Sequence, residues 1–523
     1  MTRRRFPMKY TFFVLSLVLV FSPRLSAERP NIILLYADDL GYGDVGCYNP
    51  ERGKIATPNL DRLASEGMRF TDGHSSSGVC TPSRYTILTG RYHWRSRLQK
   101  SIVGLWGDPL IPPDRMTVGS LAKQHGYVTA CVGKWHLGWN WPIKPSQVSL
   151  FRSPGKKAAT ATDKHRAAWH DVFSRPIPGG PTAVGFDEYF GTDVPNWPPY
   201  CFIENDRTLG IPTEYADETL FVRNQASKQG PALAGWTLEP ILPALADRAI
   251  EFIQRQAETP DPFLLYLPFT SPHTPLSVND EWKGKSGLSL YADFVMETDA
   301  VVGRILDAID DSTASEDTLV VFTSDNGCAP YIGVADLEEK GHYPSGPLRG
   351  YKADAWEGGH RVPFIVRWPS HVEPGTVNHQ LVHQADLIAT VAEILEAELP
   401  DDAGEDSFSF LPLLRGGSAP IRETSVSCSI QGVPSLRVHQ WKYIAAPGSG
   451  GWGKGGDQSQ PIQLYDLATD IAESKNLAAN EPERVKEMQT RLEQLIVSGR
   501  STAGAKQAND VEVRRFPITK RPR

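Results

Sequence analysis

Five short groups of side chains in this sequence could take part in metal binding, acid–base or nucleophilic chemistry. Four groups come directly after an apolar run, and the fifth places a cysteine two residues before a proline. The groups are Asp38-Asp39, Lys134-Trp135-His136, His273, Asp325-Asn326 and Cys80-Thr81-Pro82-Ser83-Arg84. Carboxylates and amides bind hard cations, histidine and lysine carry protons or charge, and cysteine can act as a nucleophile. The combination indicates an enzyme.

The apolar runs before these groups are expected to be buried strands that position them. They comprise residues 31–37, 127–133, 263–270 and 318–324. Helical patterns separate them, and one is marked by Thr57-Pro58-Asn59 at its start and by Gly67 at its end. This alternation predicts an α/β fold with a mostly parallel sheet. Because ligands bind outside the carboxyl ends of such strands, the polar groups should gather along one edge.

The two pairs Asp38-Asp39 and Asp325-Asn326 favour a site for Ca²⁺ or Mg²⁺. Their oxygens are the ligands that these cations prefer, and neither His nor Cys stands beside them, which disfavours zinc. A single Asp-Asp pair after a strand is more often a turn or a helix cap. Two pairs, each at the end of a strand, favour the metal.

Cys80 is expected at the N-terminus of a helix over residues 83–88, because Pro82 suits a first helical turn. Helix N-termini bind anions. The alternative is a buried structural cysteine, which is the usual role of a lone one. Likewise, Lys134 alone could be a surface charge and His273 a solvated loop residue.

The segment Cys80-Thr81-Pro82-Ser83-Arg84, with Thr89-Gly90 after it, resembles the type I sulfatase signature Cys-x-Pro-x-Arg followed by Thr-Gly. Four other segments and one lysine are similar to further landmarks of that family, in the family's order. They are Asp38-Asp39-Leu40-Gly41, Gly133-Lys134-Trp135-His136-Leu137-Gly138, Pro272-His273-Thr274-Pro275, Ser324-Asp325-Asn326-Gly327 and Lys352. The resemblance, to arylsulfatases and N-acetylgalactosamine-6-sulfatases, covers most of the chain. It implies an alkaline-phosphatase-like fold. Separately, the shorter and more polar strand candidates after residue 420 indicate a smaller C-terminal α+β domain.

This resemblance implies two cofactors. Cys80 would be oxidised to formylglycine by a formylglycine-generating maturation enzyme. The hydrated aldehyde would attack the sulfur of a sulfate ester, and loss of sulfate would restore the aldehyde. One Ca²⁺ would polarise the sulfate. The residues implied to hold it are Asp38, Asp39, Cys80, Asp325 and Asn326.

The resemblance also implies roles in catalysis. Lys134 and Lys352 would offset charge on the sulfuryl oxygens. His273 would protonate the leaving alcohol, and His136 would take a proton from the second hydroxyl of the hydrate. Arg84 would hold that hydrate, while Asp325 could act as the base for the attacking hydroxyl. The implied catalytic residues are Cys80, Arg84, Lys134, His136, His273 and Lys352.

Two alternative functions stay open. Phosphatases and phosphodiesterases share the implied fold, although such phosphatases typically use Ser or Thr with a two-zinc site rich in His. If Cys80 were never oxidised, the protein could bind sulfated glycans without cleaving them. His74 could reach the site, but a packing role is at least as plausible, and His360 follows Lys352 in a glycine-rich loop that could approach the substrate; neither is included among the site residues.

The expected substrate is a sulfated carbohydrate or an aryl sulfate ester. Residues 139–181 lose the strand–helix rhythm, and we expect long loops there that select the substrate. Four tryptophans could stack on sugar rings, although packing roles are common for such residues. They are Trp94, Trp106, Trp139 and Trp141.

The N-terminus predicts export. Basic residues precede the apolar stretch 11–21, and Leu25-Ser26-Ala27 is a plausible cleavage site, so residues 1–27 are expected to be a signal peptide. The mature protein would then be periplasmic or extracellular. The stretch is shorter than the roughly 20 residues of a membrane-spanning helix, and no later run qualifies. An uncleaved anchor is the alternative.

Composition limits the domains and partners. The 523 residues, 40% of them hydrophobic, can bury a large core, and the net charge of −7 gives no general attraction to nucleic acid. We expect a catalytic domain over residues 28–415. Residues 416–523 are expected to form a smaller antiparallel sheet, a helix near 481–498 and a basic tail. The six cysteines are too sparse to indicate a disulfide framework.

Overall fold

A computed structural model describes residues 1–2, 29–155, 159–221, 226–457 and 459–517. The predicted signal peptide therefore lies almost wholly outside the described residues. A ten-stranded sheet forms the centre, in the order β12-β2-β11-β10-β1-β9-β3-β4-β5-β6. Helices flank this sheet, and a separate four-stranded sheet follows in the sequence. The predicted α/β class with a smaller second sheet is confirmed.

The four predicted strands occupy the middle of the large sheet as direct neighbours. They are β10 (Thr318–Ser324), β1 (Asn31–Ala37), β9 (Phe263–Pro268) and β3 (Val128–Lys134), in that spatial order. All three pairings are parallel, and Ala37 at the end of β1 lies opposite Ser324 at the end of β10. The four carboxyl ends therefore face the same edge, as predicted.

The outer strands make the sheet mixed. On one side are β11 (Phe364–Arg367), β2 (Met68–His74) and β12 (Thr376–His383), and on the other are β4 (Glu188–Thr192), β5 (Ile203–Glu204) and β6 (Arg207–Thr208). Strand β4 is parallel to β3, whereas β11 runs antiparallel to both β10 and β2. Parallel pairing runs through the middle of the sheet from β10 to β4, where both faces are covered, and occurs again between β2 and β12 at one edge.

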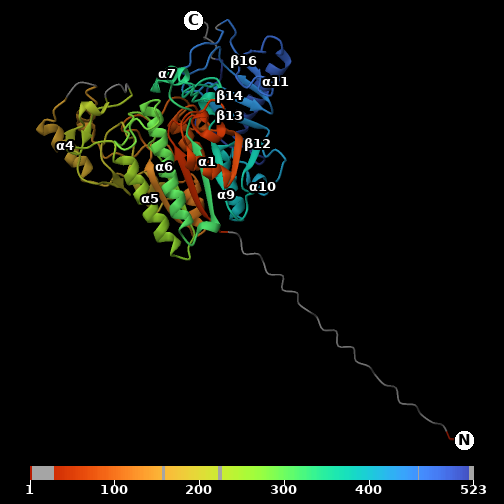
Figure 1. Cartoon of the computed structure of the whole chain (residues 1–523), viewed down its shortest axis with the longest axis horizontal. Coiled ribbons are helices and arrows are strands. Elements are labelled where there is room, and N and C mark those ends of the chain that lie inside the picture. Colours follow the sequence, from red (N-terminus) through yellow and green to blue (C-terminus); the bar gives the residue numbers. More distant parts are fainter. Residues whose placement is uncertain (3–28, 156–158, 222–225, 458, 518–523) are drawn as a thin grey trace.

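Both faces of the sheet are buried, which explains the continuous apolar runs. Along β1, Ile32, Leu34 and Tyr36 belong to one core, while Ile33, Leu35 and Ala37 belong to the other. Helices α2 (Cys80–Thr89), α3 (Val118–Gln124) and α9 (Leu387–Ile394) cover the first face. The second is covered by α1 (Pro58–Ser65), α5 (Ile241–Ala257) and α6 (Leu290–Asp310), with α5 and α6 side by side (Figure 1).

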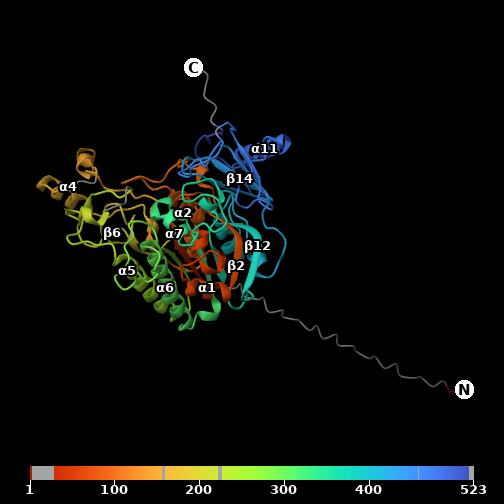
Figure 2. The same cartoon turned by 45° about the horizontal axis from the view of Figure 1, so that its top comes forward.

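The segment 139–181 is more ordered than the sequence predicted. It contains a 3₁₀ helix (Pro145–Phe151) and α4 (Asp163–Phe173). The Thr162 hydroxyl accepts a hydrogen bond from the His165 backbone N–H, which caps α4. One short apolar face, including Trp169 and Phe173, is buried, and it is too brief to give a clear helical period. Helix α4 lies at the side of the molecule opposite α11 (Figures 1 and 2).

The chain after residue 423 forms an antiparallel meander covered by one helix. Its strands are β13 (Thr424–Cys428), β14 (Pro434–Val438), β15 (Trp441–Ile444) and β16 (Gln463–Asp466), which form the predicted antiparallel sheet. The helix, α11 (Pro482–Ser498), buries Val485, Met488, Leu492, Leu495 and Ile496. The domain boundary at residue 415 stays a prediction.

Short elements complete the described chain: β7 (Glu214–Tyr215), β8 (Pro231–Ala232), α7 (Val334–Glu339), α8 (Glu357–His360) and α10 (Leu411–Leu414).

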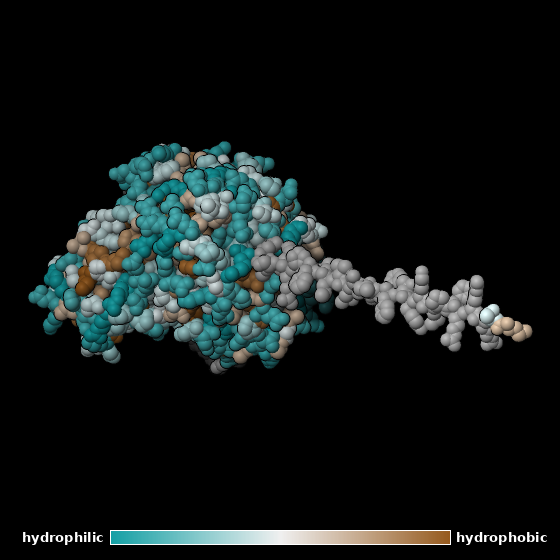
Figure 3. Space-filling view, turned by 90° about the horizontal axis from the view of Figure 1, so that it is seen from below, coloured by the Kyte–Doolittle hydropathy of each residue, from teal (hydrophilic) through white to brown (hydrophobic). Residues whose placement is uncertain are grey.

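All six cysteines are free thiols. Within the described ranges, no helix combines the length and apolar character needed to cross a membrane. The face shown in Figure 3 is mostly hydrophilic, with apolar atoms in small patches.

Candidate active site

The carboxyl edge of the sheet holds a buried cluster of carboxylates around one arginine. Asp38 and Asp39 follow β1, and Asp325 follows β10; all three are at most 1% exposed. The fully buried Arg84 places its Nη2 3.0 Å from Asp325 Oδ2 and 3.5 Å from Asp38 Oδ1. Its Nη1 donates to the Lys134 carbonyl oxygen at 3.0 Å, at the end of β3. The arginine thus joins the ends of three strands.

Two lysines reach the same cluster from different segments. Lys134 Nζ lies 2.6 Å from Asp38 Oδ2. Lys352 Nζ lies 2.5 and 2.7 Å from the two carboxylate oxygens of Asp39, and 3.6 Å from Cys80 Sγ. Three carboxylates therefore face three cationic side chains, which brings the fixed charge of the cluster close to zero. Such pairing is what permits so many charges to be buried together.

Cys80 lies at a helix N-terminus, as the sequence predicted, but α2 begins at Cys80 itself, three residues before the predicted start, and the thiol is buried in this cluster. The neighbouring hydroxyls have other partners: Thr81 donates to the His136 carbonyl oxygen, and Ser83 donates to the carbonyl oxygens of Ser77 and Val79. Gly90 ends the helix with φ 65°, a conformation that favours glycine. The signature thus fixes the start and the end of one buried helix.

The two histidines of the prediction lie at the same edge. His273 Nε2 is 3.6 Å from Asp39 Oδ2, and its Nδ1 bonds to the Thr274 carbonyl oxygen. With Nδ1 donating, a protonated His273 presents its Nε2–H toward the cluster. His136 is 3% exposed, and neither ring nitrogen has a hydrogen-bond partner among the described residues. Burial, assisted by Lys134 and Arg84, holds the pKa of His136 well below its usual value.

The cluster fits a hard cation by the chemistry of its donors. Ligand atoms of Asp38, Asp39, Cys80 and His273 all lie within 4.8 Å of one another. Asp325 Oδ1 accepts from the Asp39 backbone N–H, and Asn326 donates its amide to Asp39 Oδ1. Asp38 Oδ1 and Asn326 Oδ1 are buried and accept no hydrogen bond from the described residues. Unsatisfied buried oxygens are costly, and a bound cation would satisfy them.

The two carboxylates nearest Arg84 differ in proton affinity. Burial alone would raise the pKa of Asp38, but Lys134, His273 and Arg84 outweigh it and hold that pKa well below its usual range. At Asp325, burial and the Asp38 charge outweigh Arg84 and raise the pKa. A carboxylate with a raised pKa is the better proton acceptor of the two.

One functional candidate was missed in the sequence. Asp193 directly follows β4, and its Oδ1 accepts from the His136 backbone N–H and from the Trp139 indole at 3.3 and 3.1 Å. Burial raises its pKa to about 6. Its position after a strand was a usable signal, because the same reasoning identified the other groups, but the short β4 was not recognised as a strand.

His74 and His360 belong to a different buried group. Their Nδ1 atoms are 3.1 Å apart, and His74 Nε2 lies 2.8 Å from Asp72 Oδ1. His360 Nε2 is near the Ala355 carbonyl oxygen and Lys442 Nζ. Lys442 comes from β15 and also contacts Glu357, so this group connects the two sheets. A packing role suits both histidines.

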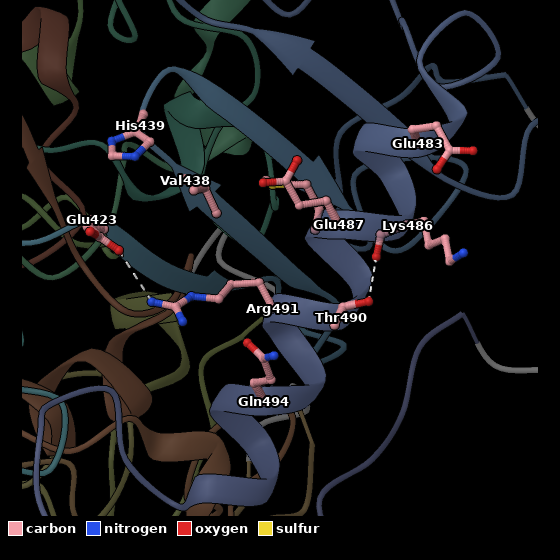
Figure 4. Close-up of a pocket in the computed structure, with 10 residues that line it drawn as sticks. Glu423, Val438, His439, Glu483, Lys486, Glu487, Thr490, Arg491 and Gln494 are labelled. Atoms are coloured by element: carbon pink, nitrogen blue, oxygen red, sulfur yellow. Dashed lines mark hydrogen bonds and ion pairs between the residues drawn. The ribbon is translucent and has the colours of Figure 1, made fainter.

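A groove of about 570 Å³ lies away from the carboxyl edge of the large sheet. It runs between α11 and the ends of neighbouring strands of the small sheet (Figure 4). Its lining includes Glu423, Glu483, Glu487, Lys486 and Arg491, and Arg491 is paired with Glu423. None of the predicted site residues lines it. Paired charges of both signs are typical of a solvated helix face.

Replacement of Arg84 by methionine should destabilise the fold strongly. The substitution leaves Asp38 and Asp325 buried without this cation, and breaking a buried pair costs about 3 to 5 kcal/mol. Urea unfolding of Arg84→Met would measure the loss. The control is Arg62→Met, which removes partly exposed pairs to Asp307 and Asp310 and should cost under about 1 kcal/mol. Equal losses in both variants would contradict this account of Arg84.

Comparison with known proteins identifies the family. The sulfatase family model matches residues 30–397. The chain is 33% identical to N-acetylgalactosamine-6-O-sulfatase of Bacteroides thetaiotaomicron, with 90% of this chain and 93% of that one covered. It is 31% identical to human arylsulfatase A, with 92% and 90% covered. A solved Bacteroides thetaiotaomicron sulfatase from a locus that metabolises multiple glycosaminoglycans superposes with a TM-score of 0.74 at 30% identity, covering 90% of this chain and 99% of that one. The chain belongs to the sulfatase family and is an enzyme that hydrolyses sulfate esters.

Proposed function

We propose that this sulfatase removes sulfate from a carbohydrate, with formylglycine at position 80 as its nucleophile and one Ca²⁺ as its metal. The observation that carries the proposal is the position of Cys80. Its thiol begins α2 beside Lys352, in one buried cluster with Asp38, Asp39 and His273. A buried structural cysteine would not need such a set of charged neighbours.

The charges of the cluster support binding of an anionic ester. Three carboxylates and three cationic side chains nearly cancel. We assign Asp38, Asp39, Asp325, Asn326 and position 80 as the residues that hold the cation. Ca²⁺ would supply positive charge that polarises the sulfate. With it bound, the centre would carry a net positive charge, which complements a sulfate ester and an ionised nucleophile.

The cationic side chains have distinct proposed tasks. Lys134 and Lys352, released in part from Asp38 and Asp39 when a divalent cation binds there, would hold the sulfuryl oxygens. Arg84 Nε has no hydrogen-bond partner among the described residues and would donate to the group at position 80. Arg84 would therefore both stabilise the buried carboxylates and position the group at residue 80.

The histidines would divide the proton transfers. His273, beside Asp39, would donate a proton from Nε2 to the leaving alcohol. His136 would accept a proton, because its lowered pKa keeps the imidazole neutral and its nitrogens are free of hydrogen bonds to described residues. Asp325, which follows β10 and lies 3.0 Å from Arg84 Nη2, would serve as the base for the attacking hydroxyl.

The relatives favour a carbohydrate as the alcohol component. One is named for 6-O-sulfated N-acetylgalactosamine, and the solved relative comes from a locus for glycosaminoglycan metabolism. We therefore propose a sulfated polysaccharide or its fragments as the substrate. Such substrates lie outside the cytoplasm, in agreement with the export signal proposed for residues 1–27 and with action in the periplasm or outside the cell. A maturation enzyme in the same host would generate the formylglycine.

The test is sulfate release from a panel of esters by protein made in a host with a maturation system. The panel holds 4-nitrophenyl sulfate, 4-nitrophenyl phosphate and sulfated oligosaccharides from chondroitin 6-sulfate, carrageenan and heparin. We expect the aryl sulfate to be cleaved at least about 100-fold faster than the aryl phosphate, and at least one oligosaccharide to be desulfated. Faster phosphate release would instead favour the phosphatase alternative. Tight oligosaccharide binding with no sulfate release would favour a binding protein.

A further inference from the structure

The two most exposed aromatic side chains in the described part of the chain lie against each other. Tyr331 is 48% exposed and Trp452 is 43% exposed, and their ring centroids are 5.8 Å apart. Each of the other described Phe, Tyr and Trp side chains is more buried. The two residues come from distant segments, one following β10 and the other between β15 and β16. The ring planes are tilted by 49° to each other, so the pair offers a ligand two apolar ring faces that meet at an angle.

Tyr331 lies next to the carboxyl edge of the large sheet, where the candidate active site is. It lies in the short 3₁₀ helix Pro330–Ile332, which follows the segment that carries Asp325 and Asn326. Its hydroxyl hydrogen-bonds with the side chain of Thr274, the residue after His273. Burial raises the pKa of that hydroxyl, and Lys352 and Asp39 are near enough to affect the pKa as well. The ring therefore stands beside the centre where the sulfate would be cleaved.

Trp452 is held next to the same centre by the segment after Lys352. Asp354, two residues after that lysine, is fully buried and accepts from the backbone N–H groups of Gly453 and Tyr351 at 2.7 and 3.0 Å. A Cβ at Gly451 would lie 2.1 Å from the Ala353 carbonyl oxygen. Only glycine therefore permits this close approach, which fixes the loop while leaving the indole exposed.

The tryptophans suggested by the sequence for sugar stacking are poorly placed for it. Trp139 is fully buried and Trp94 is 5% exposed within the core beneath the small sheet. Trp106 and Trp141 contact each other, with ring centroids 5.0 Å apart, and pack against the large core. Packing explains all four, and the strongly exposed pair Tyr331 and Trp452 is the better candidate for a stacking surface.

We propose that Tyr331 and Trp452 form a stacking platform for a sugar ring of the sulfated substrate. The inference rests on the proposed function and adds where the carbohydrate part is held. A pyranose has apolar C–H faces and polar edges, so it can stack on one of the two ring faces and contact the other while its hydroxyls stay hydrated. The platform combines the segment after β10 with a loop of the small sheet, which gives the C-terminal part of the chain a role in substrate binding.

The test compares KM and kcat of Trp452→Ala, Tyr331→Ala and wild type. The probes are the best oligosaccharide of the chondroitin 6-sulfate, carrageenan and heparin panel, and 4-nitrophenyl sulfate. We expect each alanine variant to raise KM for the oligosaccharide about tenfold, the loss that roughly one stacking contact would cause, and to leave kcat for both probes within about twofold. The ring-retaining variants Trp452→Phe and Tyr331→Phe should restore KM to within about threefold of wild type.

Val497→Ala is the matched control, because it trims another exposed apolar side chain of the C-terminal part, on α11. It should change neither KM nor kcat. An unchanged oligosaccharide KM in both alanine variants, with normal aryl sulfate turnover, would overturn the platform and leave the sulfatase proposal standing. An equal fall of kcat for both probes would assign the pair a structural role. A wild-type enzyme that cleaves the aryl sulfate but no oligosaccharide would refute the carbohydrate substrate and the platform together.

Discussion

Replacing Cys80 by alanine should lower sulfate release from 4-nitrophenyl sulfate by about 10⁴-fold to 10⁶-fold, the range seen when a nucleophile is removed from other hydrolases. The reason lies in the neighbours of the thiol. Thr81 and Ser83 are the nearest hydroxyls in the sequence, and both donate to backbone carbonyl oxygens. Neither can replace the lost group, while the cations around it would remain in place.

Mass spectrometry of the peptide that contains Cys80 tests whether this residue is converted to formylglycine. In protein from a host with a maturation system, we expect a peptide lighter by the difference between a thiol side chain and an aldehyde. Cys201→Ala is the control, since Cys201 is a buried thiol outside the cluster and should keep full activity. An unmodified thiol in an active enzyme would refute formylglycine as the nucleophile. Full activity of Cys80→Ala would exclude position 80 from the chemistry altogether.

Cys80→Ser tests whether attack on the ester can occur without the later release of sulfate. A serine hydroxyl at the start of α2 could attack the ester, but the resulting sulfate ester would have no second hydroxyl on the same carbon to expel it. We therefore expect loss of steady-state turnover as in Cys80→Ala, with a gain of one sulfuryl group on the residue 80 peptide after incubation with substrate. Steady turnover by Cys80→Ser would contradict the need for the aldehyde.

The sequence was most informative where burial on both faces left an unbroken apolar run. Strands β1 and β10 have the predicted bounds, and the groups after them meet because both strands end at the same edge. Their spatial order could not be read from the chain, since β10-β1-β9-β3 follows from long-range pairing. Strand β4 was missed because it is short, and Asp193 was missed with it.

The side-chain contacts within the site could not be predicted from the sequence either. Lys352 was selected by family resemblance, but its contact with Asp39 depends on how the segment after α7 folds back on the sheet. The contact between Tyr331 and Trp452 depends on the glycines at 451 and 453, whose close approach to the Ala353–Asp354 segment is a tertiary property. Local patterns identify strands and signatures, whereas side-chain contacts between distant loops require the structure.

Removal of Ca²⁺ should reduce both activity and stability. A chelator would remove the charge that balances the sulfate, so we expect sulfate release to fall at least about 100-fold. Unfolding measured in urea should show a loss of roughly 2 to 3 kcal/mol relative to protein at about 100 times the Kd for Ca²⁺. Re-addition of Ca²⁺ should restore both. Activity that survives complete removal of divalent cations would contradict the assignment.

Asp38→Asn tests which residues hold the cation, without relying on turnover. Asp38 Oδ1 is buried and accepts no hydrogen bond from the described residues, with Arg84 Nη2 3.5 Å away, and the amide keeps the shape of the side chain while removing the charge that attracts a cation. We expect the Ca²⁺ concentration needed for half of the stabilisation to rise at least about tenfold. Asp193→Asn is the control, because Asp193 bonds to the His136 backbone but lies outside the carboxylate cluster. The same Ca²⁺ dependence in wild type and Asp38→Asn would place the cation elsewhere, whereas a loss in Asp38→Asn alone would locate it at the ends of β1 and β10.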